Sequence, residues 1–160
     1  MKFIADSMLG RLARWLRLLG CDTLYYPQIE DSLLLKIARE ENRILLTRDT
    51  CLVKVRGLQQ FLLLKENDPF KQLGNVINTF KLNLPDKSKG GEDVVFLSRC
   101  SVCNASVNNI PKEDAKCFVP EYVYQTSDVF RQCSGCGKFY WRGTHPEKFR
   151  KKLSEVMQLI

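Results

Sequence analysis

The chain has 160 residues, of which 44% are hydrophobic and 27% are charged, and its net charge is +7. This balance is typical of a soluble globular protein, and the length fits one domain or one domain plus a small module. No run of 18 or more apolar residues is present and residues 1–10 lack an apolar signal core, so we expect no membrane span, no export and a cytoplasmic location.

Short apolar strands alternate with helices over the first 80 residues. Strands are predicted at 2–5, 22–26, 43–47 and 60–64, and helices at 8–19, 32–41 and 70–80. This alternation predicts an α/β fold in which a parallel sheet is joined by crossover helices. The near-continuous apolar runs of the third and fourth strands predict burial on both faces of the sheet.

The composition changes after the last of these helices. Residues 85–93 are rich in Pro, Gly and charge, which predicts a linker between a domain at 1–97 and a second one at 98–160. A C-terminal helix is expected to begin at a capping box of Thr144 and Glu147. Its apolar stripe consists of Phe149, Leu153, Val156 and Leu159.

Three acidic residues follow three of the predicted strands. Asp6 ends the first strand, Asp31 begins the helix after the second, and Asp49 lies two residues beyond the third. Ligands of a parallel sheet bind outside the carboxyl ends of its strands, so we expect these carboxylates at one edge. Carboxylates brought together favour a cation, and hard oxygen ligands suit Mg²⁺ or Mn²⁺. Such an ion activates water and stabilises the charge of an attacked phosphodiester.

Each of these residues also has an ordinary structural interpretation. Asp6 and Asp31 stand where an aspartate caps a helix, and Asp49 stands where it closes a turn. Thr47 is either a plain strand residue or one that orients the Asp49 carboxylate or a bound water. Arg48 could pair with a carboxylate or a substrate phosphate, but its guanidinium cannot serve as acid or base.

The helix at 8–19 carries arginines on one face. At about 100° per residue, Arg11, Arg14 and Arg17 lie opposite the four leucines that are expected to pack on the sheet. The arginines are expected to face solvent, where guanidinium groups suit phosphate. A solvated face without function is the alternative. Trp15 borders both faces and is interpreted as a packing residue, with base stacking as its alternative.

Four of the seven cysteines form two CxxC pairs, Cys100 with Cys103 and Cys133 with Cys136. Two such knuckles predict a closed four-thiolate site for a structural zinc ion, with two redox pairs as the alternative. The gap of 29 residues, 104–132, is longer than is usual in a zinc ribbon and predicts an inserted excursion.

Side chains suited to nucleic acid follow the second pair. Lys138 and Arg142 could contact phosphate, whereas Tyr140 and Trp141 could stack on bases or pack on the first domain. The single histidine, His145, is interpreted as a cap or a surface residue.

Together these motifs resemble a known family. An early strand ending in Asp6, an acid leading the next helix and the strand end Thr47-Arg48-Asp49 resemble the PIN-domain metal-dependent ribonucleases. The stretches ADSMLGRLARWLRLLGCDT, ILLTRDTCL, RCSVCN and CSGCGKFYWRGTH are similar to the Mut-seven-type C-terminal ribonuclease-domain family, in which a PIN-like domain is fused to a zinc ribbon. The resemblance implies a three-layer fold and a Mg²⁺- or Mn²⁺-dependent ribonuclease acting on RNA, with Asp6, Asp31 and Asp49 as its acids.

The sequence leaves several questions open. Many PIN nucleases have a fourth acid, and Asp68 is the candidate here, although it stands equally well as a helix cap before Pro69. One and two catalytic metal ions are therefore both allowed. The alternative functions are a non-catalytic zinc-ribbon RNA-binding module, a subunit of an RNA-processing complex, and a phosphatase. The RNA that is cut, internal or terminal cleavage, and a protein partner or homo-oligomer are left undetermined.

Overall fold

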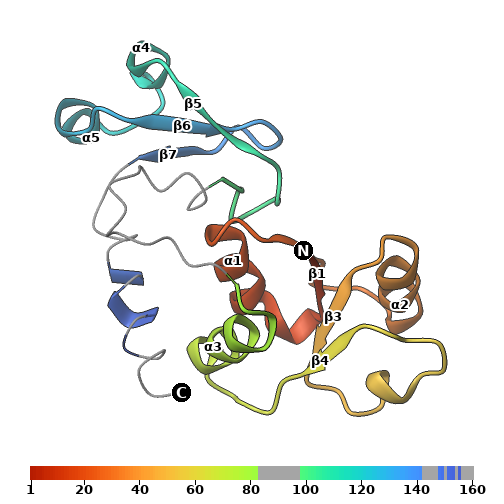
Figure 1. Ribbon diagram of the computed structural model, residues 1–160. Coiled ribbons are helices and arrows are strands. Elements are labelled where there is room, and N and C mark those ends of the chain that lie inside the picture. The colour runs from red at the N-terminus through yellow and green to blue at the C-terminus, as the bar shows by residue number, and fades with distance from the viewer. Residues whose placement is uncertain (83–97, 142–147, 150, 154, 156–160) are drawn as a thin grey trace.

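A computed structural model shows a four-stranded parallel sheet with helices on both faces, joined to a three-stranded antiparallel sheet (Figure 1). The structure describes residues 1–82, 98–141, 148, 149, 151–153 and 155. The expected linker and domain boundary lie outside these residues, as do six side chains named above: Arg142, Thr144, His145, Glu147, Val156 and Leu159.

The N-terminal elements follow the predicted alternation, which confirms the α/β fold. In chain order they are β1 (Lys2–Ala5), η1 (Ser7–Leu9), α1 (Gly10–Leu18), β2 (Asp22–Tyr25), α2 (Asp31–Glu40), β3 (Ile44–Thr47), η2 (Leu52–Lys54), β4 (Phe61–Leu63) and α3 (Pro69–Phe80). The helix predicted at 8–19 begins with the single 3₁₀ turn η1 and becomes α-helical at Gly10.

The strand order is β2-β1-β3-β4, and all neighbouring strands are parallel. The chain passes from β1 to β2 on one side and later returns to β3 on the other side of β1, so the direction of the connections reverses between β1 and β3. Helices α1 and α3 cover one face and α2 covers the other, which completes three layers (Figure 1). Ligands of open α/β sheets bind at the carboxyl ends of the strands at such a reversal.

Alternate side chains of the central strands fill two apolar cores. Phe3 and Ala5 of β1 face α1 and α3, whereas Ile4 faces α2, as the period of two in a strand requires. Strand β3 alternates in the same way and is buried on both faces, as predicted. The same prediction for β4 is wrong, because β4 is an edge strand and leaves Phe61 41% exposed.

Aromatic side chains extend the larger core toward the C-terminal residues. Trp15 packs on Phe70 with ring centroids 4.0 Å apart, which confirms its interpretation as a packing residue. Phe149 and Leu153 belong to the same core, so described residues from the end of the chain pack back on α1 and α3.

The second sheet has the order β5-β6-β7. The first CxxC pair precedes β5, and the second begins at the last residue of β6. Its elements are β5 (Val107–Ile110), α4 (Lys112–Ala115), α5 (Glu121–Thr126), β6 (Phe130–Cys133) and β7 (Phe139–Trp141). The two short helices form the excursion predicted between the pairs. They pack on Phe130 through a small core of Ala115, Val119 and Val123. In the described part of the chain, no helix is long and apolar enough to cross a membrane.

Candidate active site and metal centre

Asp6 lies at the reversal point, one residue beyond β1. Its backbone N–H donates to the Leu46 carbonyl at 3.0 Å, which extends the pairing of β1 with β3. Asp6 is 5% exposed, and its carboxylate accepts hydrogen bonds from the Thr47 hydroxyl at 2.6 Å and the Ser7 hydroxyl at 3.1 Å. No Lys or Arg among the described residues forms an ion pair with it. A buried carboxylate with hydroxyl donors alone is costly, so this position favours a bound cation.

Thr47 links Asp6 to Asp49. Its hydroxyl donates to the Asp6 carboxylate and accepts from the Asp49 N–H at 2.9 Å. One alternative for Thr47 was that its hydroxyl orients the Asp49 carboxylate, but the hydroxyl holds the carboxylate of Asp6. The Asp49 Oδ1 atom accepts from the Cys51 N–H at 2.6 Å, so this residue does close a turn. Its other oxygen has no hydrogen-bond partner in the described residues.

Helix capping, the structural alternative for these acids, explains one of them and not the others. Asp6 precedes η1 without a side-chain capping bond, and Asp31 lies inside α2, whose N-cap is Glu30. Asp68 does act as a cap, because its carboxylate accepts from two backbone N–H groups in the first turn of α3 at 2.9 and 3.0 Å. Capping therefore accounts for Asp68 and leaves Asp6 and Asp31 without that explanation.

The three predicted acids do not form a preassembled cluster. Within the described ranges, the one group of three or more Cys, His, Asp or Glu side chains arranged to hold a metal ion is the set of four cysteines. Asp6 and Asp49 are joined through Thr47, while Asp31 is exposed at the start of α2. The arrangement supplies one oriented, buried carboxylate with two further acids on neighbouring connections.

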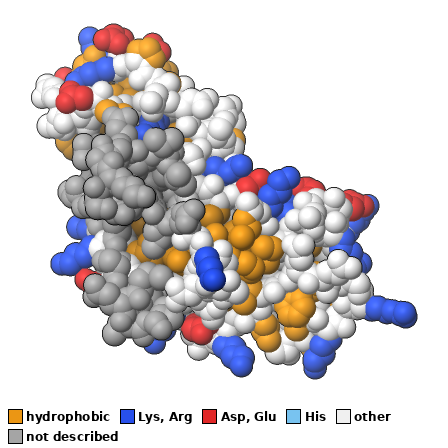
Figure 2. Space-filling model, in the orientation of Figure 1, with side chains coloured by type: hydrophobic (Ala, Val, Ile, Leu, Met, Phe, Trp, Pro, Cys, Tyr) orange, Lys and Arg blue, Asp and Glu red, His pale blue; other side chains and the backbone are white. Residues whose placement is uncertain are grey.

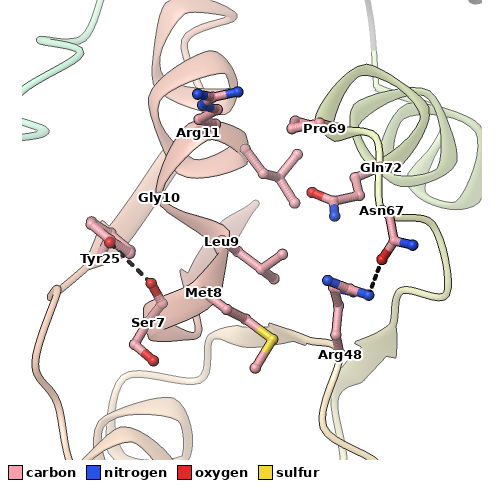
Figure 3. A pocket seen from close by; sticks show the side chains of 11 residues that line it. Ser7, Met8, Leu9, Gly10, Arg11, Tyr25, Arg48, Asn67, Pro69 and Gln72 are labelled. Carbon is pink, nitrogen blue, oxygen red and sulfur yellow. Dashed lines mark hydrogen bonds between the residues drawn. The ribbon is translucent and has the colours of Figure 1, made fainter.

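A pocket of about 320 Å³ opens at this edge of the sheet, and its lining includes Ser7, next to Asp6, and Arg48, next to Asp49 (Figure 3). Its walls come from η1, the start of α1, the end of β2, the residue after β3, the loop before α3 and the first turn of α3. Arg11 and Arg48 both line it, and Arg48 donates to the side-chain oxygen of Asn67. Neither guanidinium pairs with an acid among the described residues, so two cations face a pocket at the carboxyl edge of the sheet.

The basic charge of the chain is otherwise dispersed. In Figure 2, Lys and Arg side chains are spread over the visible face and form no single patch on it. Arg14 is exposed on α1, as predicted, and Lys138 is exposed after the second CxxC pair. The pair of Arg11 and Arg48 is therefore the more specific electrostatic feature.

Arg17 corrects the prediction of an arginine face. The expectation that it faces solvent is wrong, because its side chain is 5% exposed. Its Nε donates to the Thr23 carbonyl at 2.8 Å, and its Nη1 donates to the carbonyls of Val102 at 2.7 Å and Ser101 at 3.3 Å. Burial lowers the pKa of its guanidinium. The phosphate role predicted for Arg17 is replaced by a structural one, since it ties α1 and β2 to the first CxxC pair.

Asn104 makes a second link between the two sheets, and the sequence interpretation missed it. Its Oδ1 accepts from the Thr23 N–H at 3.1 Å, and its Nδ2 donates to the Asp22 carboxylate at 2.8 Å. Partial burial opposes ionisation of Asp22, but hydrogen bonds from Arg43 and Asn104 hold the pKa of this carboxyl below its usual range. These contacts lie at the amino end of β2. The part of the chain with the CxxC pairs and the second sheet, residues 98–141, is called the cysteine module, and it docks at the edge opposite Asp6.

The four predicted cysteines are brought together by the second sheet. Their sulfur atoms all lie within 4.8 Å of one another, with Cys100 and Cys136 at 3.5 Å and Cys103 and Cys133 at 3.3 Å. Zinc–sulfur bonds of about 2.3 Å place tetrahedral sulfurs about 3.8 Å apart, so the cluster has the size for one zinc ion.

The two CxxC pairs have matching backbone geometry. In each pair, two backbone N–H groups point at the first sulfur, at 3.4 and 3.5 Å for Cys100 and at 3.3 and 3.4 Å for Cys133. Each pair is followed by a residue in the left-handed region, Asn104 with φ 70° and Gly137 with φ 71°. Asn tolerates this conformation better than most residues. Asn104 directly follows the first CxxC pair, as Gly137 follows the second, and this position in the sequence could have indicated a structural role for Asn104.

The close approach of four thiols favours a bound cation. Burial opposes ionisation of Cys100, but hydrogen bonds from Tyr140 and backbone N–H groups lower its pKa to about 6. At Cys136 a backbone hydrogen bond at Lys138 is outweighed by burial and the neighbouring thiols, which raise the pKa to about 12. Thiolates this close repel one another, and a divalent ion removes the conflict. Tyr140 is thus engaged at the cluster, with its hydroxyl 3.1 Å from the Cys100 sulfur.

Replacing Arg17 with methionine is expected to lower the free energy of unfolding by about 2–4 kcal/mol, because it leaves buried carbonyls without their charged donor. Chemical denaturation of the zinc-loaded protein measures this change. Arg14→Met, on the exposed part of the same helix, is the matched control and is expected to change stability by no more than about 0.5 kcal/mol. Equal stability of the two variants would contradict the structural role of Arg17.

The comparisons with known proteins agree with this architecture. A sequence profile described as the Mut7-C RNAse domain matches residues 1–153. No curated protein and no solved structure showed a match to the chain. The matched range spans the parallel sheet and the cysteine module, so the two occur together in one family.

Proposed function

The chain belongs to the Mut7-C RNAse domain family, and from this premise we propose that it is a ribonuclease whose cleavage of RNA depends on Mg²⁺ or Mn²⁺ bound by Asp6, Asp31 and Asp49. The observation that carries the proposal is the Asp6 carboxylate, which is buried at the reversal point of the sheet and lacks a cationic partner among the described residues. Carboxylate oxygens are the ligands that these ions prefer.

Three acids on neighbouring connections would supply the ligands of such an ion. Asp6 would supply a carboxylate oriented by Thr47 and Ser7, Asp49 would supply the oxygen that is not used in its turn, and Asp31 would complete the set from the first turn of α2. A bound ion supplies positive charge that offsets the charge of the phosphodiester and acidifies a water molecule.

Cations of the chain would hold the RNA backbone. Arg11 and Arg48 face the adjoining pocket, where planar guanidinium groups can bind phosphate through two hydrogen bonds. Arg14 and Lys138 are exposed and remain candidates for further phosphate contacts. The zinc site takes no part in cleavage in this proposal, because four thiolates close the coordination sphere of a zinc ion.

The test uses zinc-loaded protein and defined end-labelled RNAs, with Mn²⁺ or Mg²⁺ removed by dialysis and then added back. We expect cleavage only when the ion is present. Chelators are avoided because they would also remove zinc. A protein that shifts RNA in a gel but cuts none at any Mn²⁺ concentration is a non-catalytic binder, and hydrolysis confined to small phosphate esters indicates a phosphatase. Either result contradicts the proposal.

Thr47 is proposed as a positioning residue for Asp6. Thr47→Val removes the 2.6 Å hydrogen bond without changing the size of the side chain, and we expect cleavage and apparent Mn²⁺ affinity to fall about 10- to 100-fold. Thr47→Ser keeps the hydroxyl and is expected to restore both. Cleavage assays across a Mn²⁺ titration measure the effect. Equal loss in the two variants, or none in either, would be inconsistent with the role of the hydroxyl.

A further inference from the structure

Gln72 is a buried amide in the pocket beside the proposed active site. It lies on α3, is 3% exposed and lines the pocket together with Arg11 and Arg48. Figure 3 shows its amide group extending from α3 into the space between α3 and α1. The function proposed above assigns no role to this residue.

One half of the Gln72 amide has a structural partner. Its Nε2 donates to the Glu66 carbonyl at 2.9 Å. A carbonyl oxygen can only accept, so this bond determines which end of the amide carries the nitrogen. The Oε1 atom must therefore occupy the other position, and no donor among the described residues reaches it. The pocket thus contains a buried acceptor that protein groups leave unpaired.

The two arginines supply positively charged hydrogen-bond donors, whereas Gln72 supplies an acceptor. Arg11 and Arg48 lie at opposite ends of the pocket in Figure 3, with Gln72 nearer to Asn67 on the α3 side. The Asn67 side chain accepts from Arg48 and holds its guanidinium. A ligand suited to all these groups carries a phosphate and, a short distance away, an N–H or O–H donor. A pocket of about 320 Å³ is of small-ligand size.

We infer that this pocket is a nucleotide subsite, in which Arg11 or Arg48 holds a phosphate and the Gln72 Oε1 atom accepts a hydrogen bond from the base or the ribose. The inference rests on the proposed function, since it identifies a nucleotide of the RNA as the occupant. The Gln72 acceptor makes binding selective, because a ligand without the donor leaves the buried oxygen unpaired. Two donors have the required chemistry, the 2′-hydroxyl and an amino or imino group of the base.

The test measures binding of single nucleotides to the zinc-loaded protein in the absence of Mg²⁺ and Mn²⁺. The probes are the four nucleoside 5′-monophosphates, their 2′-deoxy forms and analogues lacking the exocyclic amino group. We expect the ligand that lacks the recognised donor to bind about tenfold more weakly. A loss of affinity with the deoxy form identifies the ribose, and a loss with the analogue that lacks the amino group identifies the base. Equal affinities throughout, or no binding, would overturn the inference.

Gln72→Met tests whether this selectivity comes from the amide. The variant keeps the length of the side chain and removes the acceptor, so we expect the tenfold difference between the paired ligands to disappear. The control is Asn75→Leu, because Asn75 also contacts Glu66, through its carboxylate at 3.4 Å, but does not line the pocket. It is expected to retain the discrimination. Discrimination that survives in Gln72→Met would exclude the amide as its source.

A second readout locates the ligand without a substitution. The side-chain NH₂ resonance of Gln72 is expected to shift when the best-bound nucleotide is added, and shifts confined to other regions would refute the inference. These measurements require no cleavage. If the protein binds nucleotides with this selectivity but cuts no RNA, the subsite is supported and the proposed catalysis is contradicted. If it cuts RNA but shows no such selectivity, the proposed catalysis is supported and the subsite is contradicted.

Discussion

Asp6→Asn is expected to reduce RNA cleavage on the order of 10³-fold while leaving the fold intact. Asparagine has nearly the shape of aspartate, and its oxygen can still accept from Thr47 or Ser7, so the end of β1 keeps one of these two hydrogen bonds. The substitution removes the charge that would hold a divalent ion. Cleavage of end-labelled RNA in Mn²⁺, thermal unfolding and Mn²⁺ binding should be measured on the same preparation.

The control for Asp6→Asn is Asp68→Asn. Asp68 caps α3, and asparagine is an equally good N-cap, so this variant is expected to retain both stability and cleavage. RNA binding in a gel should persist in both variants. Full activity of Asp6→Asn, with contaminating nuclease excluded, would falsify the metal site. A loss in Asp68→Asn as large as that in Asp6→Asn would instead identify Asp68 as a fourth acid.

Cys136→Ser is expected to abolish zinc binding and to unfold the cysteine module. Cys136 is exposed, so the substitution disturbs little packing and its effect reports loss of the metal. Structural zinc sites contribute on the order of 10 kcal/mol to the folding of small modules. Because Asn104 bonds the Thr23 N–H and Arg17 bonds the Thr23 carbonyl, we expect hydrogen exchange at β2 to accelerate as well.

Zinc content by elemental analysis and hydrogen exchange by mass spectrometry test this prediction. The matched control is Cys117→Ser, another exposed free thiol, which lies outside the four-sulfur cluster and should leave zinc content and exchange unchanged. If Cys136→Ser still held zinc with full affinity, the closed four-thiolate site would be excluded. If it lost zinc while β2 remained protected, the module and the parallel sheet would fold independently.

Local pattern was sufficient for most of the parallel sheet. Strands β1 and β2 and helix α2 lie within one residue of their predicted ends, because apolar periodicity records which side chains are buried. Strand β4 shows what apolar periodicity does not reveal. An apolar run such as residues 60–64 indicates a strand, but its position at the edge follows from pairing with β3 on one side only.

The candidate site was predictable in outline and not in its contacts. The carboxyl ends of parallel strands share an edge, so the positions of Asp6 and Asp49 followed from the strand assignments. The partner of the Thr47 hydroxyl did not follow, because it depends on register. Ala5 pairs with Leu46, which brings Asp6 beside Thr47.

The sequence by itself determined the four-cysteine site, the alternation of strands and helices, and the acids at the strand ends, since each depends on spacing along a short stretch of chain. Only the tertiary structure decided the role of Arg17, whose partners Ser101 and Val102 lie 84 and 85 residues further along the chain. The same holds for the amide of Gln72, which faces a pocket built from several separate segments. Helical periodicity assigns a side chain to a face, but it does not show what covers that face.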